Sequence, residues 1–287
     1  MSFPSDAAST RVRYAVLGHP VAHSQSPFIH AAFAQQTGEP VDYGRIDCGP
    51  DGFIAAVQAF AASGAGGCNI TVPFKFVAIG LARQVTERAR LAGAANILRF
   101  DADGWLADNT DGAGLLRDIT QHAGFDPKGR RVLLIGAGGA GSGVLGPLLK
   151  ARPRQLMVVN RTAPRAHDLV AGHADLAAAN GVDLQSAALE QPGQAYDLVI
   201  NASASSLQAG GVPVPATVLA TGSLAIDLMY GAAAQGFLDW ARDHGAQGRD
   251  GLGMLVEQAA EAFDIWRGVR PDTVPVLQAL RRQLAAA

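Results

Sequence analysis

The sequence predicts an α/β protein with two domains, each built on a mostly parallel sheet. Its 287 residues are enough for two domains of ordinary size, each with its own apolar core. Hydrophobic residues make up 48% of the chain and charged residues 17%, a mixture typical of a compact folded protein. Short β-rich runs also alternate with helical patterns, which is the order that βαβ units produce.

The first half of the chain carries three predicted strands with two predicted helices between them. The strands are expected at Tyr14–Leu17, Val41–Ile46 and Cys68–Val72, and the helices at Ser26–Thr37 and Asp51–Ala62. This alternation predicts one mostly parallel sheet.

A hairpin is expected to close this first sheet. Asn96–Phe100 and Trp105–Ala107 flank Asp101–Gly104, whose Asp-Gly pair favours a tight turn. The helical pattern of Gly112–Gly124 then leads to a turn at Asp126–Gly129. We expect the chain to pass from one domain to the other in this connection.

A second alternating series follows, and it predicts a doubly wound sheet. Its strands are expected at Arg131–Ile135, Gln155–Asn160, Tyr196–Ile200 and Ser223–Met229. The tail has apolar residues at helical spacing and predicts helices over Leu252–Trp266 and Thr273–Leu284.

Charge and cysteine content argue against several classes of function. The formal net charge of −2 gives no basic field for nucleic acid or an acidic membrane surface, so small ligands are expected. Cys48 and Cys68 form no Cys-x-x-Cys pair and no histidine cluster completes a zinc site, so we expect buried thiols and no metal. Met1–Thr10 lacks the pattern of a signal peptide, which favours a cytoplasmic protein. The uncharged run Val132–Leu149 contains six glycines and Pro147, so it predicts a strand, a turn and a helix rather than a membrane span.

A glycine-rich segment indicates a dinucleotide site. Gly136, Gly138, Gly139, Ala140 and Gly141 belong to a Gly-Ala-Gly-Gly-Ala-Gly sequence that follows an apolar strand and opens a helix. Glycines permit the sharp turn and the close approach of a pyrophosphate, and the helix N-terminus attracts that anion. The alternative is a flexible glycine loop without a ligand.

The end of the next strand indicates which dinucleotide binds. NAD enzymes usually place an acidic residue there to bond the ribose 2′-hydroxyl. This chain has Asn160, Arg161 and Thr162 instead, with Arg165 close behind. Two arginines suit a 2′-phosphate, so the sequence predicts NADP. For Arg165 alone, a solvated helix start is the alternative interpretation.

Ser24 and Ser26 are candidates for binding a carboxylate. In an extended segment their hydroxyls would face the same way, and beside a helix start they could hold an anion. The alternative is a serine that caps a helix beginning at Pro27, which is the commoner use of Ser-Pro.

Polar residues at two further places could supply acid–base groups. Asn69 and Thr71 are expected on one face of a strand that stops just before Lys75. Asp108 and Asp111 lie at the start of the connecting helix. A surface lysine and a helix-capping aspartate are the alternative interpretations of these charges.

Taken in order, these segments resemble the shikimate dehydrogenase family over nearly the whole chain. The matching stretches are Ser24–Pro27, Asn69–Lys75, Leu91–Asn96, Asp108–Gly112, Gly136–Gly141, Asn160–Thr162 and Gly251–Gln258. The resemblance implies a substrate-binding α/β domain beside a Rossmann-type doubly wound nucleotide domain. It also implies hydride transfer between NADP(H) and shikimate or 3-dehydroshikimate, in the shikimate pathway of aromatic amino acid biosynthesis.

The resemblance also assigns roles to single residues. Ser24 and Ser26 would bind the substrate carboxylate with Tyr230 nearby, and Met229 and Gly253 would line the nicotinamide pocket. Ring hydroxyls would be held by Thr71, Asn96 and Gln258 together with Lys75 and Asp111. Because Gln258 belongs with the substrate residues, we expect residues 1–110 and 252–287 to form the substrate-binding domain and residues 111–251 the NADP-binding domain. The chain departs from the family pattern at Ile97, where threonine is common, and at Ser142, where a basic residue is common.

The expected chemistry assigns acid–base work to Lys75 and Asp111. Oxidising a secondary alcohol removes a hydride from carbon and a proton from oxygen, so an acid–base group must touch that oxygen. A paired carboxylate can orient the ammonium and modify its basicity. One alternative is a quinate or dual quinate/shikimate dehydrogenase, whose NAD-preferring members should carry an acidic residue near Asn160. Another is an NADP(H)-sensing regulator without catalysis, which should lack Lys75 or Asp111. The protein is expected to be a monomer or a homodimer.

Overall fold

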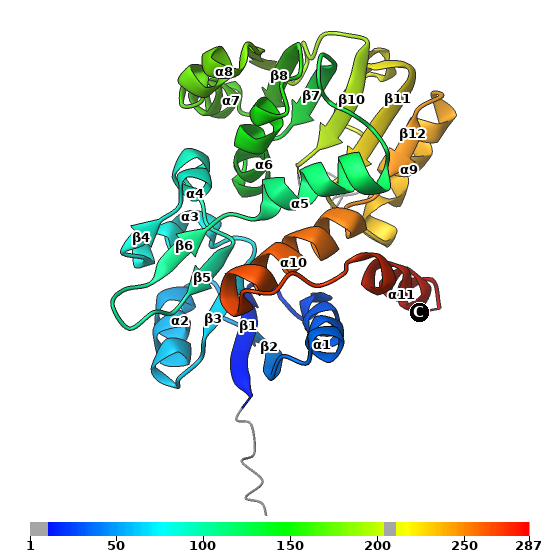
Figure 1. Cartoon of the computed structure of the whole chain (residues 1–287). Helices are drawn as coiled ribbons and strands as arrows, with labels where there is room; N and C mark the ends of the chain where they lie inside the picture. The colour runs from blue at the N-terminus through cyan, green and yellow to red at the C-terminus, as the bar shows by residue number, and fades with distance from the viewer. Residues whose placement is uncertain (1–10, 204–210, 287) are drawn as a thin grey trace, which may run out of the picture.

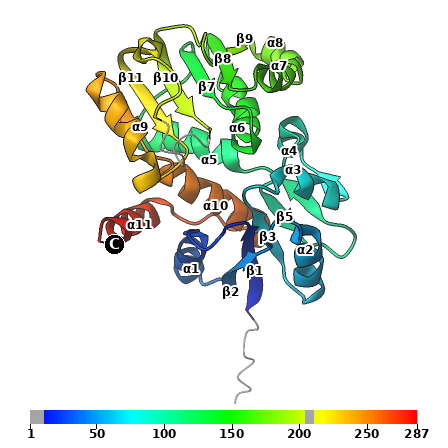
Figure 2. The same cartoon turned by 180° about the vertical axis from the view of Figure 1, so that it is seen from behind.

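The computed structural model describes residues 11–203 and 211–286, and it contains two separate sheets (Figures 1 and 2). The segment 1–10, in which we expect no signal peptide, lies outside the described residues. Helices α5 (Asp111–Arg117) and α10 (Leu252–Arg267) run side by side between the two sheets in both views. The predicted α/β architecture is therefore confirmed.

The first sheet has six strands in the order β2-β1-β3-β5-β6-β4. Their bounds are β1 Val12–Gly18, β2 Val41–Asp47, β3 Gly67–Ile70, β4 Gln84–Val85, β5 Ile97–Arg99 and β6 Leu106–Asp108. β1 pairs in parallel with β2 and β3, whereas β5 pairs antiparallel with β3 and β6. The predicted hairpin is present, but it does not close the sheet, because β4 lies outside β6 and pairs with it in parallel.

β3 ends earlier than predicted. The N–H of Thr71 still donates to the Leu17 carbonyl (2.9 Å), but the chain then turns and the N–H of Phe74 donates to the Thr71 carbonyl (3.1 Å). Pro73 has no N–H with which to continue the ladder. Thr71 therefore stands beyond the carboxyl end of the strand, and the turn leads directly to Lys75.

Helices cover both faces of the first sheet. α1 (Ser26–Thr37), α10 and α11 (Val274–Ala285) pack on one face, and α2 (Phe53–Ala62) and α3 (Lys75–Ala78) pack on the other. The short helix α4 (Glu87–Ala92) and the 3-10 turn η1 (Ile79–Leu81) lie beside β6. Trp266 of α10 stacks on Tyr14 of β1 with ring centroids 4.5 Å apart. The tail therefore packs on the first sheet although it follows the second in sequence.

The second sheet is entirely parallel, in the order β12-β11-β10-β7-β8-β9. Its strands are β7 Arg131–Ile135, β8 Gln155–Asn160, β9 Asp183–Ala188, β10 Tyr196–Asn201, β11 Leu219–Asp227 and β12 Gln247–Arg249. The strand order reverses between β7 and β10, which is the predicted doubly wound arrangement. Sheets of this kind bind ligands at the carboxyl ends of the strands beside the reversal.

Helices also cover both faces of the second sheet. One face packs α5, α6 (Gly139–Lys150), α7 (Ala163–Ala171) and α8 (Ala174–Asn180), and the other packs α9 (Ala232–Asp243) and the 3-10 turn η4 (Ala216–Val218). The uncharged run Val132–Leu149 is thus a strand, a glycine turn and a helix, as predicted. Over residues 11–203 and 211–286, no helix is both long enough and apolar enough to cross a membrane.

Helix α5 packs between a helix of each sheet. It continues as a π-helical turn, η2 (Asp118–His122), where one regular helix was predicted. A Cβ on Gly112 would lie 2.4 Å from Cγ of Pro147 in α6, and a Cβ on Gly114 would lie 2.7 Å from the backbone nitrogen of Gln258 in α10. Glycine at these positions therefore allows the close approach of both neighbours, and it places Asp111 where the two sheets meet.

Candidate active site

Lys75 and Asp111 form a direct ion pair at this junction. Lys75 begins α3 and Asp111 begins α5, so the turns after β3 and β6 bring them together. Nζ of Lys75 lies 2.5 Å from Oδ2 of Asp111, and the side chains are 15% and 1% exposed. The N-cap of α5 is Thr110, so Asp111 does not occupy the capping position considered as an alternative. A buried pair of this kind is stable only when further hydrogen bonds satisfy the carboxylate.

Asn96 supplies such a bond. Its Nδ2 donates to Oδ1 of Asp111 (2.9 Å) and to Oε1 of Gln258 in α10 (3.2 Å). Its Oδ1 accepts from the N–H of Thr110 (2.8 Å), and the residue is 3% exposed. Four of the predicted residues are therefore joined by direct side-chain contacts: Lys75, Asn96, Asp111 and Gln258.

Two residues of this cluster were not singled out from the sequence. The Thr110 hydroxyl lies 3.0 Å from Nδ2 of Asn96 and is buried. Oδ1 of Asn109 accepts the N–H of Asp111 (3.1 Å), and its Nδ2 donates to the Ala94 carbonyl (3.0 Å). Their place within the motif Asp108–Gly112 was the only signal in the sequence.

Ser24 and Ser26 form a second polar group at the start of α1. Their hydroxyls are 3.1 Å apart, and the N-cap of α1 is Gln25, so neither serine occupies the capping position. Nε of Arg45 donates to the Ser24 carbonyl (3.0 Å), so the positively charged guanidinium of Arg45 lies beside the two serines. Burial raises the pKa of Tyr230, and a hydrogen bond with the backbone of Gln25 offsets part of that rise.

Asn69 lies in β3, an interior strand of the first sheet, and Thr71 follows the carboxyl end of that strand. Nδ2 of Asn69 donates to the Asn96 carbonyl (3.3 Å), and its Oδ1 accepts from the Tyr43 hydroxyl in β2 (2.6 Å). Thr71 is half-buried and packs closely on Gly18. A Cβ added to Gly18 would lie only 2.3 Å from Cγ2 of Thr71. Asn69 therefore ties the Asn96 backbone to β2.

The glycine segment forms the turn between β7 and α6. Gly136 has a φ of +110°, which favours glycine, and a Cβ on Gly141 would lie 2.1 Å from the Gly136 carbonyl oxygen. Gly138 is the N-cap of α6, and the space around it is open. A Cβ on Gly139 would lie 3.6 Å from Cβ of Lys75. The turn therefore places the N-terminus of α6 against α3 and its lysine.

The residues after β8 lie beside the glycine turn. Oδ1 of Asn160 accepts the N–H of Ala137 (3.2 Å), and its Nδ2 donates to the Thr162 carbonyl (2.9 Å). Arg161 and Arg165 are exposed, and neither takes part in an ion pair with another described residue. Both guanidinium groups are therefore available to a phosphate.

Met229 and Gly253 lie where the chain after β11 meets the start of α10. The Met229 carbonyl accepts the N–H of Gly251 (2.8 Å). A Cβ on Gly253 would lie 1.8 Å from Oδ1 of Asp118, so η2 leaves no room for a side chain there. The place of these two residues at the nicotinamide stays a prediction.

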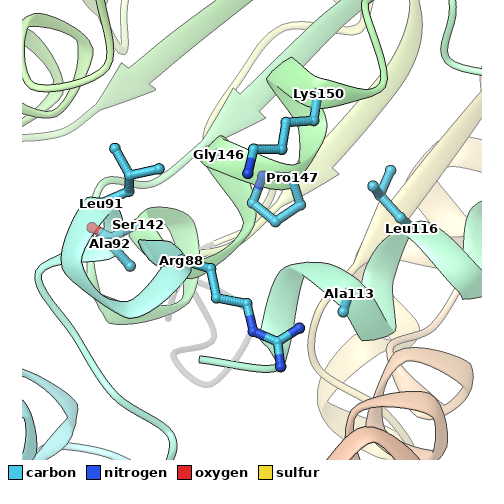
Figure 3. Close-up of a pocket in the computed structure, with 9 residues that line it drawn as sticks. All are labelled: Arg88, Leu91, Ala92, Ala113, Leu116, Ser142, Gly146, Pro147 and Lys150. Carbon is cyan, nitrogen blue, oxygen red and sulfur yellow. The ribbon is translucent and has the colours of Figure 1, made fainter. Parts of the chain in front are cut away.

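An apolar pocket of about 270 Å³ lies beside α5, between α4 and α6 (Figure 3). It is lined by Arg88, Leu91, Ala92, Ala113, Leu116, Ser142, Gly146, Pro147 and Lys150. None of the residues predicted to bind substrate or cofactor lines it, so this pocket is separate from the Lys75–Asp111 cluster.

Three family models match the chain in succession. Residues 16–98 match the shikimate dehydrogenase substrate binding domain, residues 118–209 match shikimate / quinate 5-dehydrogenase, and residues 251–281 match the shikimate 5′-dehydrogenase C-terminal domain. The shikimate dehydrogenase (NADP(+)) of Methylibium petroleiphilum is 63% identical over 286 residues, which cover 98% of this chain and 97% of that protein. The chain belongs to the shikimate dehydrogenase family.

Solved structures agree with membership of the shikimate dehydrogenase family. The crystal structure of an Ael1 enzyme from Pseudomonas putida superposes with a TM-score of 0.85 at 46% identity, covering 94% of this chain and 98% of that one. The shikimate 5-dehydrogenase of Thermus thermophilus, solved in complex with NADP(H) and shikimate, superposes with a TM-score of 0.81 at 30% identity, covering 94% and 99%. The family resemblance noted in the sequence is therefore confirmed, while the roles of single residues stay predictions.

Proposed function

We propose that this protein catalyses the NADP-dependent interconversion of 3-dehydroshikimate and shikimate, in the biosynthesis of aromatic amino acids. Relatives named shikimate dehydrogenase (NADP(+)) match nearly the whole chain. The observation that carries the proposal is the buried Lys75–Asp111 pair, which is bonded to Asn96 and lies against the glycine turn at Gly139.

The Lys75–Asp111 pair handles the proton of the reacting hydroxyl. When shikimate is oxidised, its hydride passes to the nicotinamide of NADP⁺ and the hydroxyl proton passes to the pair. Nζ of Lys75 bonds the reacting oxygen, and Asp111 holds that nitrogen at 2.5 Å. Asn96 donates to the other carboxylate oxygen (2.9 Å), which keeps Asp111 from rotating away. In the reverse direction the pair returns the proton to the carbonyl oxygen.

The second sheet provides groups that suit NADP. The open N-terminus of α6 at Gly138 suits the pyrophosphate, because backbone N–H groups and the helix dipole both favour an anion there. Arg161 and Arg165 would take the 2′-phosphate, with the turn held in shape by Asn160. Met229 and Gly253 would contact the nicotinamide.

The first sheet provides groups that suit a hydroxylated carboxylic acid. Ser24 and Ser26 present two adjacent hydroxyls for the carboxylate, and the cation of Arg45 beside them favours an anion. Tyr230 lies at the same segment. Ring hydroxyls would then reach Thr71, Asn96 and Gln258.

We also infer that the chain divides into the two domains that the sequence predicts. Residues 1–110 and 252–287 form the substrate-binding domain, and residues 111–251 form the nucleotide-binding domain. The packing of α10 and α11 on the first sheet supports this division. We infer that the protein works in the cytoplasm as a monomer or a homodimer, and light scattering of the purified protein distinguishes the two states.

A spectroscopic assay tests the proposed function. We expect purified protein to form NADPH rapidly from NADP⁺ and shikimate, and slowly when NAD⁺ replaces NADP⁺ or quinate replaces shikimate. Equal rates with quinate would favour a dual quinate/shikimate dehydrogenase. NADP⁺ binding without turnover on either acid would contradict catalysis and favour a nucleotide-sensing regulator.

A further inference from the structure

A chain of six bonded side chains runs along α10 from η2 to β6. In order, its members are His122, Glu257, Arg270, Glu261, Arg88 and Asp108. Neighbouring members approach within 2.6 to 2.9 Å. The series joins η2, whose Ile119 packs in the core of the second sheet, to β6 of the first sheet. Arg88 of α4 is the member that bonds Asp108, at the start of the turn before Asp111.

Asp108 is the last residue of β6, and its buried carboxylate accepts two bonds from Arg88, from Nε (2.6 Å) and from Nη2 (2.7 Å). It also accepts the Thr86 hydroxyl (2.6 Å) and the N–H of Asn109 (2.6 Å). Asn109 in turn accepts the N–H of Asp111 (3.1 Å). The bonds from Arg88 therefore hold one end of a short turn whose other end is Asp111.

The third bond from Arg88 reaches α10. Nη1 donates to Oε1 of Glu261 (2.9 Å), which lies one helical turn after Gln258. Arg88 thus bonds both to the turn that carries Asp111 and to the helix that carries Gln258. The side chains of Asp111 and Gln258 also both accept hydrogen bonds from Nδ2 of Asn96.

We propose that Arg88 is a positioning residue for the hydride-transfer reaction, acting by setting the place of the Asp108–Asp111 turn against α10 and so the geometry of Asp111 against Lys75. This inference rests on the proposed function. Arg88 does not belong to the Lys75–Asp111 cluster, so it acts through Asp108 and Glu261.

A guanidinium suits this place better than an ammonium. Its planar fork gives two N–H groups to one carboxylate and a third to another, whereas an ammonium is a compact charge on a flexible stem. Burial would lower the pKa of Arg88, but the bonds to Asp108 and Glu261 outweigh burial and raise it. Burial would raise the pKa of Glu261, but the bonds to Arg88 and Arg270 lower it. Both groups therefore stay charged near neutral pH.

Arg88 also forms part of the wall of the apolar pocket beside α5. Figure 3 shows its side chain reaching from α4 toward the chain that leads into α5. Truncation of this side chain would enlarge the pocket and leave the place of the guanidinium open to a small cation. This arrangement makes chemical rescue a practical test.

The test compares Arg88→Lys and Arg88→Ala with a matched control, Arg99→Lys. Nε of Arg99 bonds both carboxylate oxygens of Asp101 (3.0 and 2.9 Å), and its Nη1 donates to a carbonyl of α10 (3.4 Å), but the pair lies at the far end of β5 from Asn96. We expect Arg88→Lys to lower kcat about 10- to 100-fold, since small misplacements of reacting groups have effects of that size. KM for NADP should stay near the wild-type value, and Arg99→Lys should keep near-normal kcat. Guanidinium ion added to Arg88→Ala should restore part of kcat.

Thermal melts and the wild-type assay separate the outcomes. A merely structural arginine would lower Tm while leaving kcat per folded enzyme unchanged in Arg88→Lys, and this result would overturn the positioning role even if Arg88→Ala fails to fold. A rise in KM for NADP at unchanged kcat would also overturn it. If the wild-type protein itself forms no NADPH from shikimate, the proposed function fails; wild-type turnover with normal Arg88 variants contradicts the positioning role alone.

Discussion

The side chains around Asp111 are bonded to one another, whereas the arginines after β8 are exposed and have no ionic partner among the described residues. Around Asp111, the side chains of Lys75, Asn96 and Gln258 already have hydrogen-bond partners. After β8, the guanidinium groups of Arg161 and Arg165 are exposed to solvent. Under the proposed function, this difference means that the substrate side would be organised for chemistry before a ligand arrives, whereas the nucleotide side would gain its partner when a phosphate binds.

Removing Lys75 should give the largest effect on turnover. Lys75→Ala changes no residue of the glycine turn, keeps the Cβ that faces Gly139 and leaves Arg161 in place. We therefore expect kcat to fall about 10²- to 10⁴-fold while KM for NADP changes little. Lys128→Ala is the matched control, because Lys128 is an exposed lysine in the turn before β7. Steady-state kinetics on both variants, with folding checked by thermal melts, measure the effect. Wild-type turnover of Lys75→Ala at saturating shikimate would remove the lysine from the mechanism.

Removing Arg161 should raise KM for NADP and leave kcat nearly unchanged, the opposite of the effect expected for Lys75→Ala. A charge-assisted bond to phosphate contributes about 1.5 to 3 kcal/mol, so KM for NADP should rise about 10- to 150-fold in Arg161→Ala. KM for shikimate should change much less, and the preference for NADP over NAD should narrow. Arg154→Ala is the control, since Arg154 is exposed just before the opposite end of β8. Equal losses with NADP and NAD would show that Arg161 does not read the 2′-phosphate.

The buried His30 should make the stability of the first sheet depend on pH. It stacks on Tyr43, whose hydroxyl bonds Asn69, and burial lowers the pKa of His30 from 6.5 to about 3. The unfolded chain therefore binds this proton more tightly, so the free energy of unfolding should fall as the pH drops from about 6.5 toward 3. One such proton contributes about 1.4 kcal/mol per pH unit.

The variant His30→Phe keeps a stacked ring and lacks that proton. We expect its free energy of unfolding to fall less steeply between pH 6 and pH 4 than that of the wild type, by about 1 kcal/mol per pH unit. The two proteins are compared by the slope of the free energy of unfolding against pH, because repacking around the substituted ring would shift stability by the same amount at every pH. Urea titrations between pH 6 and pH 4 measure this slope. Equal slopes for the two proteins would show that His30 does not stay neutral when buried.

The sequence predicted the parts of the fold that have strong local patterns. The glycine turn was placed correctly because an apolar strand precedes it and a helix follows it. β9 and β12 were missed: β9 is a partly exposed edge strand without a clear apolar alternation, and β12 has three residues. β4 was also missed: it has two residues and pairs with β6 at the end of the first sheet.

The site was predictable to the extent that its residues stand in motifs. Lys75, Asp111 and Asn96 were found in this way, and the structure shows them in contact. Arg88 has no motif of its own to mark it, because its importance depends on Asp108 and Glu261, which lie far away in sequence. Long-range partners of this kind follow from tertiary packing and cannot be inferred from local spacing.

The central claim is that Lys75 and Asp111 act as one unit, and a double-mutant cycle on kcat tests it most directly. Lys75→Ala, Asp111→Asn and the double variant are compared with the wild type under saturating NADP and shikimate, with each protein's folding verified. Because groups that act together lose their function together, we expect the double variant to lose far less than the product of the two single losses. Losses that multiply would show that the two residues contribute independently and would contradict the account.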